Sequence, residues 1–193
     1  MPFSAHGPEP PPGTRIRYDE LVETIQARSP ACGSTTVVAV DGPSGSGKSD
    51  LADRLAKRLG AQVLRVDELV PGWHGLAKMP PVVARDVLAP IATGELAAVR
   101  EWNWVDDRPG ELVDVRPGPF LVLDGCGSGS RVIRPYLSLL AWVDAPEEVR
   151  RARAMARDGD VYAPWWDVWA AQERALFAAE QTKVAANVRL RSG

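Results

Sequence analysis

The sequence has no long apolar run, few cysteines and little net charge, and each shortage excludes a class of protein. No segment approaches the roughly 20 apolar residues of a membrane-spanning helix, and the N-terminal region lacks a basic stretch followed by an apolar one. Cys32 and Cys126 are too few and too widely separated to suggest a disulfide framework or a metal cluster, so we expect reduced thiols. A formal net charge of −2 argues against a broad nucleic-acid-binding face. The sequence therefore predicts a soluble, cytoplasmic protein whose partner is neither a membrane nor a nucleic acid.

The 193 residues suit a single domain with a sizeable core. Residues 1–13 contain five prolines and two glycines, which cannot sustain a helix or a sheet, and are predicted to form a disordered tail. We expect residues 14–193 to fold as one domain. Apolar residues at helical spacing between Tyr18 and Ile25 predict an extra helix over residues 14–28, packed on the core.

Strands and helices are predicted to alternate along the rest of the chain. Apolar runs indicate strands over residues 35–41, 62–66, 120–124, 137–144 and 187–190. Helical patterns cover residues 50–59, 81–93, 146–158 and 165–181. Residues 97–104 and 111–115 indicate a small β-hairpin that turns around residues 107–110. This order predicts an α/β fold with a mostly parallel five-stranded sheet covered by helices on both faces.

The most specific motif is a glycine-rich loop over residues 42–49, which matches G-x-x-x-x-G-K-S in full. It lies between a predicted strand and a predicted helix, the setting in which backbone N–H groups converge on a polyphosphate. Lys48 is placed to reach the β- and γ-phosphates, and Ser49 offers a hydroxyl to Mg²⁺. The candidate nucleotide-binding residues are Gly42, Ser44, Gly45, Ser46, Gly47, Lys48, Ser49 and Asp50. The loop predicts a nucleoside triphosphate, taken as ATP, together with Mg²⁺.

Carboxylates at strand ends supply candidates for the chemistry, because ligands of open parallel sheets lie beyond the carboxyl ends of the strands. Asp67 follows the second strand and is the candidate base that accepts the proton of a hydroxyl. Asp124 ends the strand over residues 120–124, where a carboxylate can hold Mg²⁺; Ser49 and Asp67 are the other candidate metal ligands. Asx turns or helix caps are the alternative roles for both aspartates, and Glu68 is a second candidate base.

Three arginines follow the strand over residues 137–144. Arg150, Arg153 and Arg157 are three and four residues apart and therefore share one helical face. Guanidinium groups on a lid over residues 146–165 would neutralise a transferring phosphoryl group and exclude water. The alternative is a solvated face, with acidic residues of the same helix as ion-pair partners.

In their order, these motifs resemble the uridine kinase-like group of P-loop kinases, within the nucleoside and nucleotide kinase superfamily. The resemblance runs over about residues 35–160, through Asp41–Ser49, Arg65–Asp67, Glu101–Arg108, Leu121–Gly125 and Val143–Arg157. It implies a three-layer P-loop NTPase fold with a helical lid, Asp67 as the base, Asp124 beside Mg²⁺ and catalytic lid arginines. It further implies that Trp102, Trp104 and Arg108 grip the acceptor.

The chain also departs from that family. Asp124 stands where the family usually has Glu, Asn103 stands where Asp is usual, and the Phe-Tyr pair expected after Asp67 is absent. The phosphotransferase interpretation therefore survives better than uridine as the substrate. Trp73, Trp102 and Trp104 offer stacking surfaces for a planar or ring-shaped acceptor, and the alternative for each is packing in the core.

The function favoured by these patterns is transfer of the γ-phosphate of ATP to a hydroxyl of a small molecule, nucleoside-like or other. The alternative is a P-loop protein that hydrolyses or binds nucleotide as a switch or module, without such an acceptor. No paired acidic residues follow the strand over residues 120–124, and the Ser-Gly-Gly-Gln and Thr/Asn-Lys-x-Asp motifs of other nucleotide-hydrolysing classes are absent. The acceptor's identity and the oligomeric state are left open.

Overall fold

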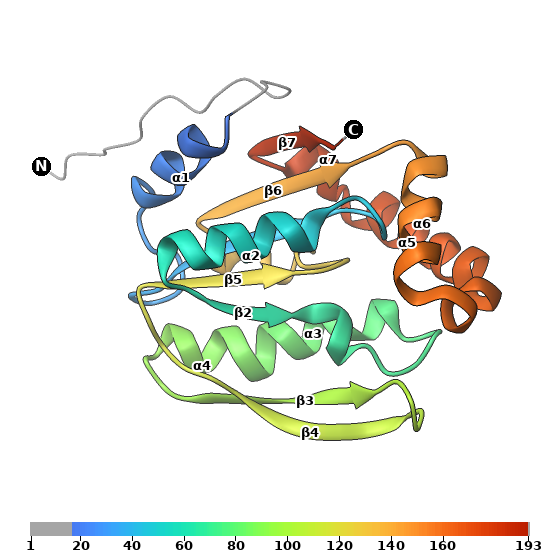
Figure 1. Cartoon of the computed structure of the whole chain (residues 1–193). Helices are drawn as coiled ribbons and strands as arrows, with labels where there is room; N and C mark the ends of the chain where they lie inside the picture. The colour runs from blue at the N-terminus through green and yellow to red at the C-terminus, as the bar shows by residue number, and fades with distance from the viewer. Residues whose placement is uncertain (1–16, 193) are drawn as a thin grey trace, which may run out of the picture.

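A computed structural model describes residues 17–192, so the tail predicted over residues 1–13 lies outside the described part. Five strands form the central sheet: β1 (Thr36–Asp41), β2 (Gln62–Arg65), β5 (Phe120–Asp124), β6 (Leu139–Asp144) and β7 (Val188–Arg191). They stand in the order β2-β5-β1-β6-β7, and each neighbouring pair is parallel (Figure 1). The predicted α/β fold is confirmed, and the sheet, expected to be mostly parallel, is parallel throughout.

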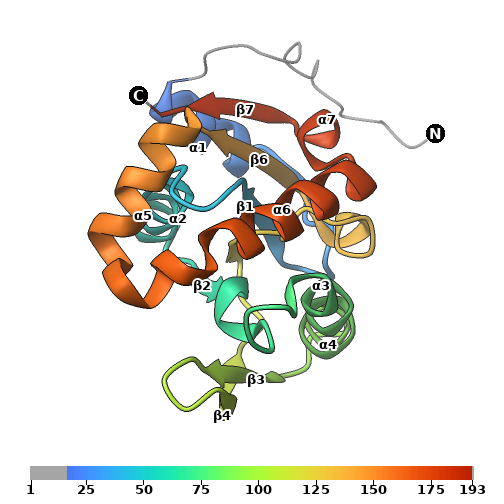
Figure 2. The same ribbon diagram turned by 90° about the vertical axis from the view of Figure 1, so that its right-hand side faces the viewer.

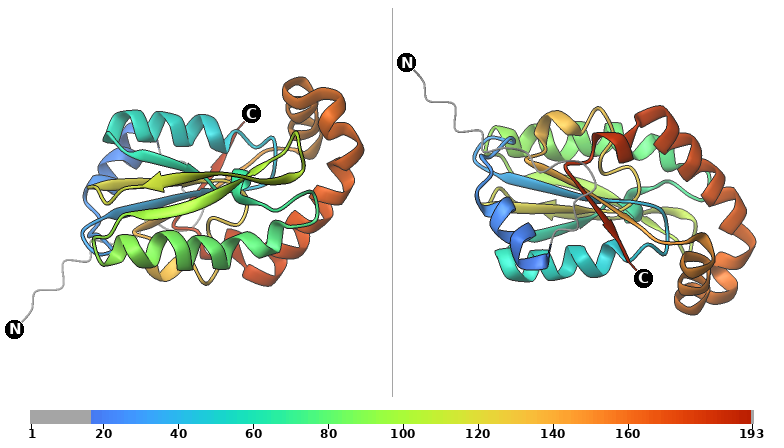
Figure 3. Two further views of the ribbon diagram at one scale, coloured as in Figure 1. Left: turned by 90° about the horizontal axis from the view of Figure 1, so that it is seen from below. Right: turned by 90° about the horizontal axis from the view of Figure 1, so that it is seen from above.

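Helices cover both faces of this sheet. One face carries α1 (Tyr18–Gln26) and α2 (Lys48–Leu59); the other carries α3 (Met79–Val82), α4 (Ala89–Ala92) and α6 (Trp166–Glu180) (Figure 3). A π-helical segment, Val83–Leu88, joins α3 to α4. None of the helices described between residues 17 and 192 is long and apolar enough to cross a membrane.

The helix predicted over residues 81–93 begins earlier than expected. A 3₁₀ turn, Leu76–Lys78, leads directly into α3, so helical backbone starts before the two prolines. Pro80 and Pro81 lie in the first turn of α3, where the N–H group that proline lacks would have no intrahelical partner. The prolines therefore belong to the start of this helix and do not precede it.

Alternate residues of β1 enter different layers of the core. Val38 and Val40 pack with α1 and α2, whereas Val37 and Ala39 pack with the helices of the opposite face. All six residues of the strand are buried. A strand buried on both faces has no polar side to show, which accounts for the continuous apolar run in the sequence.

The predicted hairpin forms beyond β2 as a separate two-stranded sheet of β3 (Ala97–Asn103) and β4 (Arg108–Val115). Its turn was expected at residues 107–110, and this placement is wrong, because Pro109 and Gly110 lie inside β4. Asn103 closes the turn earlier: its side-chain oxygen accepts the N–H groups of Val105 and Asp106, both at 3.0 Å. An outer strand tolerates proline, since the missing N–H need not join a ladder.

Two helices cross the edge of the sheet at which the parallel strands end (Figure 2). The first, α5 (Glu147–Tyr162), is longer than the helix predicted over residues 146–158 and kinks at Gly159, where φ is 52°. After a 3₁₀ turn, Ala163–Trp165, the chain returns through α6, and α7 (Thr182–Ala185) leads to β7. The segment predicted as a lid, residues 146–165, therefore lies over the carboxyl ends of the strands.

The buried carboxylate of Asp41 connects two loops at this edge. Oδ1 accepts the N–H groups of Gly42 (2.7 Å) and Gly127 (3.0 Å), and Oδ2 accepts that of Gly129 (2.8 Å). Burial raises the pKa of Asp41 to about 7, although the three N–H groups act in the opposite direction. Asp41 thereby fixes the loop after β1 to the loop after β5.

We expect Asp41→Asn to destabilise the protein by roughly 1–3 kcal/mol, because the amide places an NH₂ group among N–H donors. The free energy of unfolding should fall by this amount in urea titrations. Asp19→Asn, an exposed change in the first turn of α1, is the matched control and should cost less than about 0.5 kcal/mol. An Asp41 variant as stable as the control would contradict this role.

The stabilities of wild type and of Asp41→Asn should also depend differently on pH. The pKa of the Asp41 carboxyl is about 7 in the folded protein, against an ordinary value of 3.8. Between pH 3.8 and pH 7 the folded state therefore binds the carboxyl proton more tightly than the unfolded state does. The stabilisation from Asp41 is therefore complete in acid and is lost as the pH rises towards 7. The difference in unfolding free energy between wild type and Asp41→Asn should be larger at pH 5 than at pH 8.

Candidate active site

The glycine-rich loop leaves β1 at Asp41 and enters α2 at Lys48 through a left-handed backbone. Gly42, Gly45 and Gly47 have φ values of 149°, 76° and 87°. A side chain at Gly42 would collide with the carbonyl oxygen of Val143, and one at Gly45 with that of Arg150. The loop can pass this close to the end of β6 and to α5 only with glycine at these positions.

Lys48 lies at the first turn of α2 and is almost fully buried, at 5% exposure. Its Nζ is 3.7 Å from Oδ2 of Asp67. Burial alone would lower the pKa of Lys48, but the acidic groups around it, Cys126, Asp67 and Glu173 foremost, raise the pKa overall. Ser46 Oγ is also buried and has no hydrogen-bond partner among the described residues. Lys48 therefore stays protonated, and the Ser46 hydroxyl is a buried group left without a partner in the described part of the chain.

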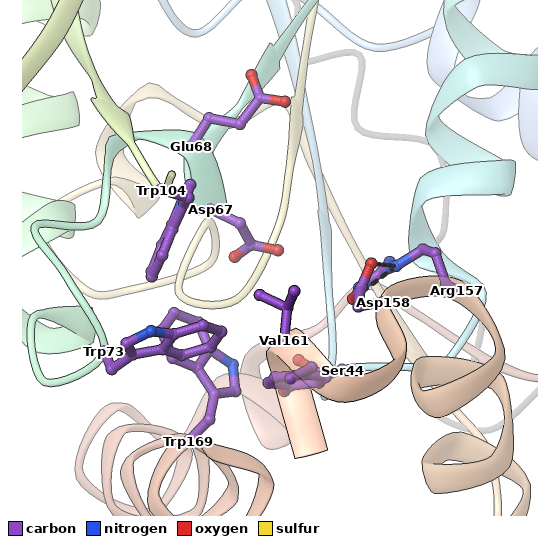
Figure 4. Close-up of a pocket in the computed structure, with 10 residues that line it drawn as sticks. Ser44, Asp67, Glu68, Trp73, Trp104, Arg157, Asp158, Val161 and Trp169 are labelled. Carbon is purple, nitrogen blue, oxygen red and sulfur yellow. Dashed lines mark hydrogen bonds and ion pairs between the residues drawn. The ribbon is translucent and has the colours of Figure 1, made fainter. Parts of the chain in front are cut away.

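Asp67 stands in the 3₁₀ turn Val66–Leu69 that follows β2. Oδ1 accepts the N–H group of Cys126 at 2.9 Å, and Oδ2 faces Lys48. Burial raises the pKa of Asp67, while the charge of Lys48 acts against this rise. Figure 4 shows the carboxylate directed into the adjoining pocket. One side chain thus borders both the glycine-rich loop and the pocket.

Asp124, the candidate metal ligand, forms an ion pair through Oδ2 with Arg65, which also binds Asp53 at 2.5 Å. Its other oxygen, Oδ1, is buried without a hydrogen-bond partner among the described residues. Between residues 17 and 192 no three or more His, Cys, Asp or Glu side chains gather as a metal site. The unpartnered Oδ1 of Asp124 nevertheless fits Mg²⁺, because Mg²⁺ at phosphates takes only one or two carboxylates from the protein.

The three arginines of α5 have different surroundings. Arg150 donates to the carbonyl oxygens of Ala145 (3.1 Å) and Ser44 (3.3 Å), and Arg153 donates to that of Gly45 (3.5 Å). Both therefore lie against the outer side of the glycine-rich loop. Arg157 is bonded to Asp158 and lines the pocket. The three share a helical face, as the spacing indicated, but only Arg157 reaches the pocket.

The pocket beside Asp67 has a volume of about 460 Å³. Its lining comes from four distant parts of the chain and consists of Ser44, Asp67, Glu68, Trp73, Trp104, Arg157, Asp158, Val161, Tyr162 and Trp169 (Figure 4). The aromatic residues contact one another: the ring centroids of Trp73 and Trp104 are 4.8 Å apart, and Trp73 stacks on Trp165 at 5.4 Å. These contacts hold in place the aromatic wall of the pocket, which consists of Trp73, Trp104, Tyr162 and Trp169.

The structure brings only part of the expected acceptor set to this pocket. Trp73 and Trp104 line it, whereas Trp102 and Arg108 are not among its lining residues. Trp102 donates its ring N–H to Asp107 at 3.2 Å, and Arg108 pairs with Asp106 within the hairpin turn. Trp104 differs from Trp102 because it lies beyond the end of β3, in the turn.

Sequence reasoning missed Glu173, a carboxylate of α6 that is 2% exposed. Its Oε1 accepts the N–H (2.8 Å) and hydroxyl (2.7 Å) of Ser44 and the ring N–H of Trp169 (3.0 Å). It thereby joins the glycine-rich loop to the pocket wall. The signal was present, because Trp166, Trp169, Ala170 and Glu173 share one buried helical face. A carboxylate on such a face needs donors.

No family model matches the chain, and no curated protein sequence matches it. Solved structures do share its fold. A "possible uridine kinase" from Bacillus stearothermophilus matches with a TM-score of 0.66 and 16% identity, over 90% of this chain and 96% of that one. D-glycerate 3-kinase from Cryptococcus neoformans var. grubii matches with a TM-score of 0.53 and 12% identity, over 89% and 92%. The fold is therefore that of P-loop kinases, as the resemblance implied.

We expect Glu173→Ala to lower the free energy of unfolding by about 2–4 kcal/mol, because the buried donors of Ser44 and Trp169 lose their acceptor. It should also weaken nucleotide binding, because the loop loses its anchor on α6. Urea unfolding and titration calorimetry measure the two effects. Glu173→Gln keeps an oxygen of the same reach and should lose less than half as much. Equal stability of the alanine variant and wild type would show that these bonds do not hold the loop.

Proposed function

We propose that the protein is an ATP- and Mg²⁺-dependent phosphotransferase that moves the γ-phosphate of ATP to a hydroxyl of a small molecule. The carrying observation is the position of Asp67, whose carboxylate lies 3.7 Å from Lys48 Nζ and also lines the aromatic pocket. A donor site at the loop and an acceptor site in the pocket would then meet at one carboxylate. The fold supports this proposal, since the structural neighbours named above are a "possible uridine kinase" and a D-glycerate 3-kinase.

On the donor side, the N–H groups of residues 42–49 and the helix dipole of α2 would bind the triphosphate. Lys48 would hold the β- and γ-phosphates with its positive charge, and the unpartnered Ser46 hydroxyl would donate to a phosphate oxygen. Arg150 and Arg153, which bind carbonyl oxygens of the loop, would keep its N–H groups directed inward.

Mg²⁺, when bound, would neutralise charge on the phosphates, with the Ser49 hydroxyl and the unpartnered Oδ1 of Asp124 as its protein ligands. Asp67 is a further ligand candidate through a water molecule. Arg65 occupies the second oxygen of Asp124 and so leaves only Oδ1 for this purpose.

On the acceptor side, Asp67 would accept the hydroxyl proton as the oxygen attacks the γ-phosphorus and the bond to the ADP oxygen breaks. Its raised pKa suits a base, because a more basic carboxylate takes up the proton more readily. Arg157, at the pocket wall, would stabilise the transferring phosphoryl group, and the aromatic wall would exclude water.

Stimulation of ADP release by an acceptor separates this proposal from its alternative, a P-loop protein that hydrolyses or binds nucleotide without a small-molecule acceptor. A kinase releases ADP faster when a hydroxyl acceptor is present and forms a phosphorylated product. Turnover that no small molecule changes, but that a protein or nucleic acid increases, would replace the proposal with a switch. Absence of turnover with every acceptor would favour a binding module.

Lys48→Ala should lower ADP formation by at least about 10²–10³-fold, because it removes the charge that stabilises the transferring phosphate. A coupled ADP assay measures this loss, and circular dichroism checks that the fold is retained. Lys57→Ala, on the exposed side of α2, is the control and should keep wild-type turnover. Near-normal turnover of the Lys48 variant would refute the assignment of the loop.

Asp67→Asn should reduce kcat by about 10²–10⁴-fold while the Kd for ATP stays nearly unchanged, because the carboxylate acts on the acceptor. Asp160→Asn changes an exposed carboxylate of α5 in the same way and serves as the control. The assay combines acceptor-dependent ADP release with calorimetry of ATP binding. If ATP binding collapses while kcat is retained, Asp67 is a nucleotide or metal residue and another group is the base.

A further inference from the structure

We propose that the phosphate acceptor is a small alcohol that carries a positively charged nitrogen, bound between the aromatic wall and the carboxylates of the pocket. The inference rests on the proposed kinase function and adds the chemical class of its substrate. It follows from two properties of the same cavity, namely which rings border it and which charges face it.

The ring of Trp104 presents a surface that attracts cations, whereas Trp73 stacks on Trp165 (5.4 Å) and on Tyr162 (5.6 Å). Trp73, Trp104, Tyr162 and Trp169 all line the cavity. Trp104 meets Trp73 at 58° and Trp169 at 71°, so neither of these rings stacks flat on it. Figure 4 shows Trp104 and Trp73 beside the carboxylate of Asp67. A cation within about 6 Å of an indole face is attracted by the ring, most strongly where water is excluded.

The charged lining has the sign that complements a cation. It comprises three carboxylates, Asp67, Glu68 and Asp158, and one guanidinium, Arg157. Arg157 already pairs with Asp158 at 2.6 Å, and Asp67 faces Lys48 at 3.7 Å, so Glu68 is the carboxylate of the lining that is left for a cation. An anionic acceptor would therefore find no uncompensated positive charge among the described residues of this lining, and bound ATP would add further negative charge. A cationic acceptor meets an opposite charge on entry.

Glu68 is the carboxylate best placed to face the cation. Glu68 and Trp104 line the same cavity, so a cation bound over the Trp104 ring would share this cavity with the Glu68 side chain. Its neighbours include Glu101 and Arg65. Arg65, in turn, is engaged by Asp53 and Asp124. A bound cation would compensate the negative charges of Glu68 and Glu101.

The hydroxyl of such an acceptor would point to Asp67 and its nitrogen to the rings. The new bond forms between the hydroxyl oxygen and the γ-phosphorus, the bond to ADP breaks, and the proton passes to Asp67. A cavity of about 460 Å³ has room for a compact amino alcohol or for a cationic ring.

The test uses the full chain with MgATP and acceptors that differ in charge at constant shape. Choline and 3,3-dimethyl-1-butanol form one pair, since a carbon replaces the charged nitrogen. Ethanolamine and 1-propanol form a smaller pair, and thiamine is the cationic ring. Uridine and D-glycerate represent neutral and anionic acceptors. We expect at least one cationic alcohol to raise ADP release, with kcat/KM about 10-fold or more above that of its neutral partner or of the other acceptors.

Each other result has a distinct meaning. Stimulation by uridine, D-glycerate or the neutral partners, equal to or above that by the cations, overturns the inference but leaves the kinase function standing. Failure of every acceptor to stimulate ADP release counts against both.

Variants then locate the charge. Glu68→Gln should lower kcat/KM about 10-fold more for the cationic acceptor than for its neutral partner. Glu111→Gln, an exposed change in β4, is the matched control. Equal loss with cationic and neutral acceptors would make Glu68 a base or a structural residue and would overturn its assignment as the charge partner. Trp104→Leu should weaken the cation in the same selective way, and Trp104→Phe should restore part of the effect.

Discussion

The left-handed backbone of the glycine-rich loop is the constraint on which the rest of this structure depends. The backbone N–H and carbonyl groups of this loop all need partners. Arg150, Arg153 and Ser192 donate to the carbonyl oxygens of Ser44, Gly45 and Ser46. The carbonyl groups are thus bound to α5 and to the chain after β7.

Two buried carboxylates complete this arrangement. Asp41 binds three backbone N–H groups and fixes the loop to the segment after β5. Glu173 binds Ser44 and fixes the loop to α6 and Trp169. Both are more than nine-tenths buried, so each depends on its donors, and removal of either side leaves uncompensated polar groups. The glycine-rich loop, the segment after β5 and α6 with Trp169 are therefore joined through buried hydrogen bonds.

Sequence patterns predicted the elements better than the contacts of individual side chains. The strands, the loop and the helix after it carry local signals, so their positions were predicted within a few residues. The hairpin turn was misplaced because Asn103, an ordinary strand residue by pattern, closes the turn with its side chain. Trp102 and Trp104 looked equivalent in the sequence, yet only Trp104 lines the pocket, because β3 ends between them. Arg150, Arg153 and Arg157 looked like one set and have separate partners.

The sequence by itself determined the α/β fold, the glycine-rich loop and the strand-end carboxylates Asp67 and Asp124, because each depends on spacing within a few residues. Only the tertiary structure decided which of these groups meet. Asp67 is 3.7 Å from Lys48 although 19 positions separate them, and Glu173 binds Ser44 across 129 positions. The pocket draws its walls from four distant segments. Such contacts depend on how helices cross the edge of the sheet, which is set by packing of the whole core and leaves no local pattern.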